Sequence, residues 1–291
     1  MDPLIQLMPA GPRLPEWLRK TRTHFDAVHE LKSDLRRLNL HTVCESARCP
    51  NMHECFHRGT ATFMILGNLC TRGCGFCSVP KSRHPGVLDP EEPANVARMA
   101  ADMRLRHVVV TSVNRDDLED GGSEHFAETV RELRRALPDA RVEVLTPDFQ
   151  GDLGSVARVL NAGPHIFNHN METVPRLYQR VRPQANYRQS LDVLQFAKQH
   201  RKDALVKSGA MLGLGETMEE VHQLMRDLRA ANVDIVTLGQ YLQPTRRNLP
   251  VAEFIPPAQF DAYRDYGLSL GFRTVFSGPL VRSSYMADLV A

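Results

Sequence analysis

From residue 60 onward, short apolar runs alternate with stretches that are apolar at every third or fourth position. The stretches around Phe126–Leu137 and Val221–Leu228 each have one apolar face and predict amphipathic helices. The apolar runs between such stretches predict six strands, Thr60–Leu66, His107–Val113, Arg141–Leu145, His165–Asn170, Leu205–Leu212 and Ile235–Leu242. Strands that alternate with helices favour parallel βαβ units with right-handed crossovers.

Six such units are too few to close an eight-strand barrel. The pattern therefore predicts an α/β protein with a partial (β/α)6 TIM-type barrel over residues 59–271, an N-terminal extension over 1–58 and a C-terminal segment over 272–291. Within the N-terminal extension, the spacing of Val28, Leu31, Leu35 and Leu38 predicts a short amphipathic helix over residues 25–38. Trp17 lies in a proline-rich arm and is expected to anchor that arm on the main body.

Composition narrows the class of protein. The chain has 291 residues, of which 42% are hydrophobic and 24% charged, and these values are ordinary for a globular protein with a sizeable core. A net charge of +2 argues against nucleic-acid binding driven by phosphate contacts. No secretory signal and no run of about 20 apolar residues is present, so we expect a soluble, cytoplasmic protein without a membrane partner.

All six cysteines lie between positions 44 and 77, in two groups of three. Cys70, Cys74 and Cys77 follow the first predicted strand with the spacing CxxxCxxC, in a loop that also contains Gly73 and Gly75. In a reducing compartment, grouped thiolates indicate metal binding rather than disulfides. Three thiolates at this spacing can hold three corners of a 4Fe-4S cluster and leave the fourth iron open to a small molecule. A structural zinc site is the alternative, although such sites usually have four ligands in CxxC pairs.

The second group is Cys44, Cys49 and Cys55, with the spacing CxxxxCxxxxxC. His41, His53 and His57 lie close by in sequence, so a Cys3His zinc site is one reading. A second 4Fe-4S cluster is the reading that we favour, because the first group already predicts one. Its fourth ligand must come from elsewhere in the chain.

Polar residues follow several of the predicted strands. They are Asn114, Arg115 and Asp116 after the second strand, Glu172 after the fourth, and Gly213, Gly215 and Glu216 after the fifth. Because active sites of parallel α/β folds lie at the carboxyl ends of the strands, we expect these residues and the cysteine loop to meet at one mouth.

A loop with the spacing CxxxCxxC after the first strand resembles the radical S-adenosylmethionine superfamily. Further phrases, over about residues 40–289, resemble the lipoyl synthase family within it. They include the upstream cysteines, Phe-Asn-His-Asn-Met-Glu-Thr-Val at 167–174, Gly-Gln-Tyr-Leu-Gln-Pro at 239–244 and Arg-Ser-Ser-Tyr at 282–285. Each phrase alone is weak evidence, whereas their order along one chain is specific.

The resemblance implies a sulfurtransferase of lipoate biosynthesis. Two sulfur atoms enter an octanoyl chain carried on a lysine of a lipoyl carrier domain, while two S-adenosylmethionine molecules become methionine and 5′-deoxyadenosine. It also implies two 4Fe-4S clusters. The cluster on Cys70, Cys74 and Cys77 would cleave S-adenosylmethionine, and the auxiliary cluster on Cys44, Cys49 and Cys55 would donate sulfur.

In this family a serine of the Arg-Ser-Ser-Tyr motif completes the auxiliary cluster. We assign that role to Ser284, with Ser283 as the alternative, and a turn or helix cap as the ordinary role of such a serine pair. The S-adenosylmethionine contacts are assigned to Asn114, Arg115, Asp116, Glu172, Gly213 and Glu216. For Gly213 and Gly215 a tight turn is the alternative, and Glu216 can instead serve the start of a helix at residue 217.

The resemblance further implies partners. These are octanoylated carrier domains (the E2 subunits of 2-oxoacid dehydrogenases and the H protein of glycine cleavage), an electron donor such as ferredoxin or flavodoxin, and an iron-sulfur carrier for cluster repair. Two other functions are kept open. One is a radical S-adenosylmethionine enzyme whose second cluster only relays electrons, and the other is a zinc-stabilised binding protein.

Overall fold

Eight strands form one curved sheet whose order in space is their order in the chain, β1 to β8. In the computed structural model, which describes residues 14–19, 25–46, 49, 51–57 and 62–284, β1 pairs antiparallel with β2 and every later pair is parallel. The strands are β1 (His41–Thr42), β2 (Thr62–Ile65), β3 (His107–Ser112), β4 (Arg141–Leu145), β5 (Ile166–Asn168), β6 (Leu205–Leu212), β7 (Ile235–Gln240) and β8 (Thr274–Gly278).

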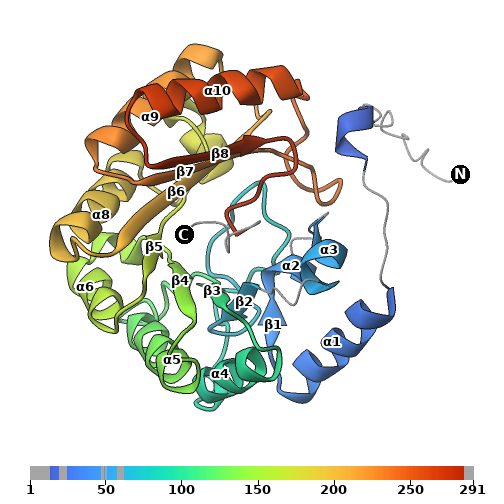
Figure 1. Ribbon diagram of the computed structural model, residues 1–291, viewed down its shortest axis with the longest axis vertical. Helices are drawn as coiled ribbons and strands as arrows, with labels where there is room; N and C mark the ends of the chain where they lie inside the picture. Colours follow the sequence, from blue (N-terminus) through green and yellow to red (C-terminus); the bar gives the residue numbers. More distant parts are fainter. Residues whose placement is uncertain (1–13, 20–24, 47–48, 50, 58–61, 285–291) are drawn as a thin grey trace, which may run out of the picture.

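Helices cover the outer face of this sheet, and the strands form an inner ring (Figure 1). The helices are α1 (Phe25–Arg37), α2 (Val43–Ser46), α3 (Met52–His57), α4 (Glu92–Asp102), α5 (Ser123–Ala136), α6 (Leu153–Asn161), α7 (Tyr178–Val181), α8 (Tyr187–His200), α9 (Met218–Ala230) and α10 (Pro257–Ser269), with 3-10 turns η1 (Glu16–Leu18), η2 (Phe149–Gly151) and η3 (Pro175–Leu177). Within the described ranges β8 pairs with β7 alone, so the ring stays open between β1 and β8. The expectation of a partial barrel is confirmed.

The six predicted strands are β2 to β7, and their bounds differ from the predictions by at most a few residues. Two strands were missed or left open. β1 is too short to produce a period in the sequence, and β8 lies in the segment after residue 271, where a final strand was only one option. Because β1 and β8 belong to the sheet, both extensions contribute to it, and the boundaries at 58/59 and 271/272 stay a prediction.

Helix α9 illustrates why the periodic stretches fold as predicted. Thr217 caps its first turn, and its side chain accepts a hydrogen bond from the backbone of Glu220, whose carboxylate in turn accepts one from the Thr217 N–H. The apolar face of Val221, Leu224, Met225 and Leu228 is fully buried. The capping hydrogen bonds and the burial of the apolar face therefore both stabilise α9.

The N-terminal arm differs from the prediction. Trp17 is 43% exposed, whereas the neighbouring Leu18 is 3% exposed. Leu18 is therefore the residue of η1 that is buried, and the expectation that Trp17 anchors the arm is wrong. No helix in the described part of the chain is long and apolar enough to cross a membrane.

Candidate active site

The cysteine loop begins where β2 ends at the mouth of the ring. Leu66 and Gly67 both have positive φ, 69° and 87°, and turn the chain out of the strand. The loop then folds back on itself, because Cys70 accepts a hydrogen bond from the Ser82 N–H at 3.0 Å and donates its own N–H to Pro80 at 2.9 Å. Cys70, Cys74 and Cys77 all line one cavity of about 180 Å3.

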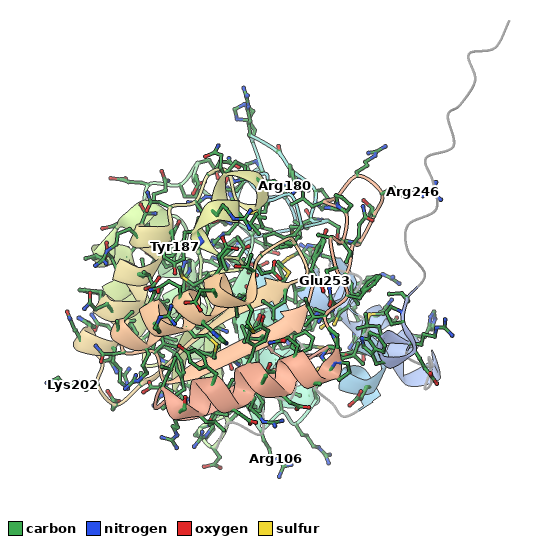
Figure 2. The ribbon with its side chains drawn as sticks, turned by 90° about the horizontal axis from the view of Figure 1, so that it is seen from above. Arg106, Arg180, Tyr187, Lys202, Arg246 and Glu253 are labelled. Carbon is green, nitrogen blue, oxygen red and sulfur yellow. The ribbon has the colours of Figure 1, made fainter. Side chains whose placement is uncertain are left out.

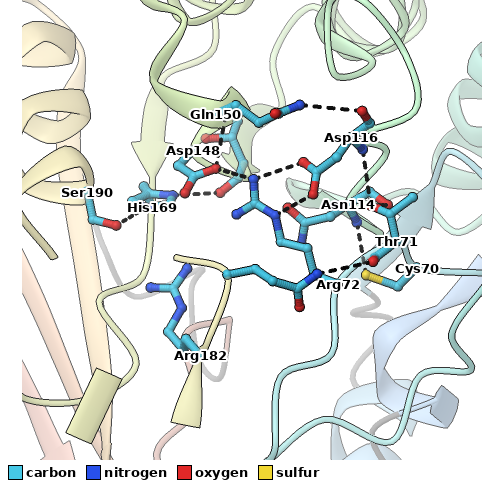
Figure 3. Close-up of polar contacts among 12 residues, drawn as sticks. Cys70, Thr71, Arg72, Asn114, Asp116, Asp148, Gln150, His169, Arg182 and Ser190 are labelled. Carbon is cyan, nitrogen blue, oxygen red and sulfur yellow. Dashed lines mark hydrogen bonds and ion pairs between the residues drawn. The ribbon is translucent and has the colours of Figure 1, made fainter. Parts of the chain in front are cut away.

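Arg72, inside this loop, ties it to the neighbouring strands (Figure 3). Its guanidinium donates to both carboxylate oxygens of Asp116, at 2.7 and 2.8 Å, and lies 2.7 Å from Asp148 Oδ1. Burial alone would raise the pKa of Asp148, but Arg72 outweighs that effect and holds it at about 2. Arg72 is 5% exposed, so the loop is fixed by a largely buried ion network from the ends of β3 and β4.

Burial changes the pKa of two of the three thiols of the loop. Burial raises the pKa of Cys74 to about 11, although the nearby Arg182 cation acts against that rise, and burial also raises the pKa of Cys77. Such thiols hold their protons at neutral pH unless a metal centre replaces them. Cys70 in turn accepts a hydrogen bond on its sulfur from the Asn114 N–H at 3.3 Å, a contact typical of cluster ligands.

Of the residues assigned to S-adenosylmethionine, Asn114 and Glu172 line the cavity of the cysteines. Glu172 has a positive φ of 65°, and burial raises the pKa of its carboxyl group against the opposing effect of Arg182. Asp116 lies beside the cavity, but both of its carboxylate oxygens bind Arg72. Its observed role is to hold the loop.

Gly213 and Glu216 do not line this cavity. Glu216 accepts hydrogen bonds from the backbone N–H groups of Gly213 and Leu214. Gly213 has a φ of 98°, and a Cβ there would overlap Gln240 and the carbonyl of Glu253. The positive φ and the close packing within the protein explain this glycine, in agreement with the tight turn that the sequence offered as the alternative.

Three cationic residues of the cavity, Arg72, Lys81 and Arg182, were not predicted from the sequence. Arg182 is 9% exposed and donates to the carbonyl oxygens of Asn170 and Met171 at 2.8 and 3.1 Å. Arg72 lies within the cysteine loop and Arg182 lies 12 residues after Asn170, the end of the fourth predicted strand, and neither position by itself predicts a buried cation. The burial of Arg72 and Arg182 at the cavity is what singles them out.

Cys44 of the second group lies in α2, Cys55 lies in α3, and Cys49 lies between the two helices in the chain. Burial raises the pKa of Cys44 to about 12, and the nearby Cys49 and Cys55 act in the same direction. The three sulfurs are therefore close enough to interact. Thr62, at the start of β2, provides hydrogen bonds that stabilise the Cys44 thiolate.

The side chains of the two adjacent serines of the Arg-Ser-Ser-Tyr motif contact different parts of the molecule. Ser284 Oγ accepts a hydrogen bond from Thr62 Oγ1 at 2.8 Å, beside Cys44. Ser283 Oγ instead accepts one from Asn170 Nδ2 at 2.9 Å, at the wall of the other cavity. Tyr285 of the motif lies outside the described residues.

Among the residues that the structure describes, no group of three or more His, Cys, Asp or Glu is arranged to hold a single metal ion. A 4Fe-4S cluster distributes its ligands over separate irons, so its cysteines need not converge on one point.

The chain is similar in sequence to known proteins. A model of the radical SAM superfamily matches residues 64–228, and a model of the N-terminal domain of lipoyl synthase matches residues 8–49. A lipoyl synthase of Rubrobacter xylanophilus is 55% identical over 94% of this chain and 85% of its own length. The chain belongs to the lipoyl synthase family. A lipoyl synthase of Thermus thermophilus is 54% identical over 97% of this chain and 88% of its own length.

Solved structures support the fold assignment. The FeFe-hydrogenase maturase HydG from Carboxydothermus hydrogenoformans matches with a TM-score of 0.57 at 13% identity, over 92% of this chain and 83% of that one. Streptococcus suis SuiB bound to S-adenosylmethionine matches with a TM-score of 0.55 at 12% identity, over 92% and 60%.

Membership of the lipoyl synthase family makes this protein a radical S-adenosylmethionine sulfurtransferase. It uses S-adenosylmethionine and iron-sulfur chemistry.

Proposed function

We propose that this enzyme inserts two sulfur atoms into an octanoyl chain on a lysine of a lipoyl carrier domain, and that it holds two 4Fe-4S clusters to do so. Cys70, Cys74 and Cys77 would hold one cluster and Cys44, Cys49, Cys55 and Ser284 the other. When bound, the first would supply the electron that cleaves S-adenosylmethionine and the second would supply the sulfur.

The observation that carries this proposal is the closeness of the two cysteine groups. Ser283 contacts Asn170 at the cavity of Cys70, Cys74 and Cys77, and the next residue, Ser284, contacts Thr62 beside Cys44. Consecutive Cα atoms are about 3.8 Å apart. In addition, Ser78, next to Cys77, donates to the carbonyl of Ser46 in α2 at 2.5 Å. One aliphatic chain can therefore reach both groups.

Ser284 rather than Ser283 is supported as the fourth ligand of the auxiliary cluster. Its oxygen lies beside Thr62, which also bonds Cys44, whereas the Ser283 oxygen faces Asn170. Arg282 adds a cation that interacts with Cys49.

For S-adenosylmethionine, Asn114 and Glu172 are the supported contacts, because both line the cavity. The carboxylate of Glu172 is suited to a cationic amino group, and the buried guanidinium of Arg182 to a carboxylate. Asp116 would act through Arg72 by holding the loop, while Gly213 and Glu216 find no support in this cavity.

The remaining parts of the proposal concern partners and location. The carriers would be E2 subunits of 2-oxoacid dehydrogenases and the H protein of glycine cleavage. An electron donor such as ferredoxin or flavodoxin would supply the electrons, and an iron-sulfur carrier would repair the auxiliary cluster. The cytoplasm would be the site of action, since reduced cysteines and iron-sulfur ligands are typical of that compartment.

The test is anaerobic purification followed by metal analysis and turnover. Two clusters predict a brown protein with about eight irons per chain, and an octanoyl-lysyl peptide that gains two sulfurs in the presence of S-adenosylmethionine and dithionite. Formation of 5′-deoxyadenosine with an unchanged peptide would instead indicate an electron-relay cluster. A colourless protein with about two zinc ions would indicate a structural zinc protein.

A further inference from the structure

The segment that contains the cysteine loop and two segments that contact it have no acidic residue. Residues 67–88, 173–191 and 241–252 lack Asp and Glu, while each contains at least two Lys or Arg. The whole chain is nearly balanced, with 36 Lys and Arg against 34 Asp and Glu. Positive charge is therefore concentrated where the site opens.

Backbone contacts bring the three segments together around Cys74 and Gly75. The Gly75 N–H donates to the Val181 carbonyl at 2.9 Å, and the Leu249 N–H donates to the Gly75 carbonyl at 3.0 Å. Lys81 lines the cavity, and its Nζ lies 3.4 Å from the Cys74 carbonyl. Arg180 directly precedes Val181, and Arg246 and Arg247 lie just before Asn248 and Leu249.

These four cations, Lys81, Arg180, Arg246 and Arg247, are here called the rim cations. All four are exposed, and none of them forms an ion pair with an acidic residue of the described chain. Arg180 and Arg246 project from the same side of the molecule, opposite Arg106 (Figure 2). By contrast, Arg176 and Arg188 of the same segments are neutralised by Glu220 and Asp192.

The proposed function requires a protein surface at this position. An octanoyl chain on a lysine is tethered to its carrier, so the carrier must lie against the mouth while the chain reaches the cysteines. Unpaired cations around such a mouth attract an acidic surface and speed association. We infer that the rim cations form the docking surface for the carrier domain, and that the carrier is acidic around its acylated lysine.

The inference rests on the proposed function and is tested by charge reversal. The rim variant is Arg246→Glu/Arg247→Glu, and the control is Arg106→Glu/Lys202→Glu, which changes the net charge equally at exposed positions away from the rim. Binding of an intact octanoylated carrier domain is measured by calorimetry at low and at high salt. Turnover of that domain and of a short octanoyl-lysyl peptide is measured with dithionite, which removes any need for a protein electron donor.

The rim variant should bind the carrier about tenfold more weakly at low salt and lose most of the salt dependence. Its kcat/KM should fall at least about tenfold more for the carrier than for the peptide, whereas the control should change either value by no more than about twofold. Wild-type affinity for the carrier, or equal losses on carrier and peptide, would overturn the inference. Turnover is also measured with reduced flavodoxin in place of dithionite, and a defect seen only with flavodoxin would overturn the inference as well, because the rim would then serve the electron donor.

Failure of the proposed function looks different. A wild-type enzyme that binds the carrier through the rim but adds no sulfur to carrier or peptide would refute sulfur insertion, and the binding data would still support the docking surface.

Discussion

His169 is a residue whose environment sets its charge. It follows β5, is 1% exposed, and bonds the Thr146 carbonyl through Nδ1 at 2.9 Å and Ser190 Oγ through Nε2 at 3.0 Å. Burial lowers the pKa of His169 to about 4, and the cation of Arg182 acts in the same direction. The imidazole is therefore neutral at physiological pH and acts as a hydrogen-bonding bridge in the wall of the cavity.

This burial predicts a pH dependence of stability. The unfolded chain takes up a proton at His169 near pH 6.5 and the folded chain only near pH 4, so the free energy of unfolding falls as pH decreases through that window. Between pH 6.5 and 5 the loss from this one residue should be about 2 kcal/mol. Urea unfolding of the wild type and of His169→Gln measures it.

The His169→Gln variant should show a shallower decline over the same range. His200→Gln serves as the control, because His200 is exposed at the end of α8. Parallel curves for wild type and His169→Gln would contradict the assignment.

The two neighbouring serines allow a sharp test of the auxiliary site. Ser284→Ala should lower the iron content from about eight toward about four per chain and abolish sulfur insertion, while 5′-deoxyadenosine is still formed. Ser283→Ala should keep close to the full iron content, because its oxygen faces Asn170. Iron analysis and peptide mass spectrometry give the answer, and the reverse pattern would assign the ligand to Ser283.

At the scale of elements, the cysteine loop is held by side chains of the loop itself and of the neighbouring strand ends. Arg72 connects it to Asp116 after β3 and to Asp148 after β4, and Thr71 adds bonds to the backbone of Asn114 and Asp116. The loop is therefore an ordered receptor for a cluster, and less conformational entropy remains to be lost on binding.

Removing the Arg72 cation should destabilise the protein strongly. Arg72→Met leaves Asp148, which is fully buried, without its counter-ion, and breaking such a pair costs about 3–5 kcal/mol. Denaturant unfolding measures the loss, and hydrogen exchange should show faster exchange at the loop. Arg83→Met is the matched control, since Arg83 is exposed in the same segment and should change stability by less than about 0.5 kcal/mol.

The whole molecule is built around a sheet whose concave side holds buried charges. Glu143 on β4 and Lys207 on β6, 0% and 1% exposed, pair at 2.9 Å, and His107 on β3 and Asn168 on β5 also contact Glu143. Burial alone would raise the pKa of Glu143, but Lys207 and His107 outweigh it and hold it at about 2. Four neighbouring strands are linked through one carboxylate.

This network predicts an asymmetry between single and double substitutions. Lys207→Met should cost about 3–5 kcal/mol of unfolding free energy, because it leaves the Glu143 carboxylate buried and unpaired. Lys207→Met/Glu143→Gln should recover most of the loss, since no net charge then remains inside. Urea unfolding of the wild type and both variants measures the difference, and equal stability of the two variants would refute the pairing.

Much of the fold could be predicted from the sequence because its signals are local. The apolar runs and their spacing predicted β2 to β7, α5 and α9. The two cysteine spacings predicted the cysteine ligands of the two proposed clusters. Such patterns depend only on residues within one helix or strand, because the spacing of buried residues differs between helices and strands.

The sequence by itself determined the alternation of strands and helices, the cysteine groups and the family to which their order is specific. Only the tertiary structure decided which serine faces which cavity, because Thr62 and Ser284 are 222 residues apart and no local period relates them. It also decided that Arg72 and Arg182 are buried beside the cysteines, and that acid-free segments meet at one rim. Contacts of this kind arise when the sheet curves and brings distant strand ends to a common mouth, a consequence of the packed fold that no single segment encodes.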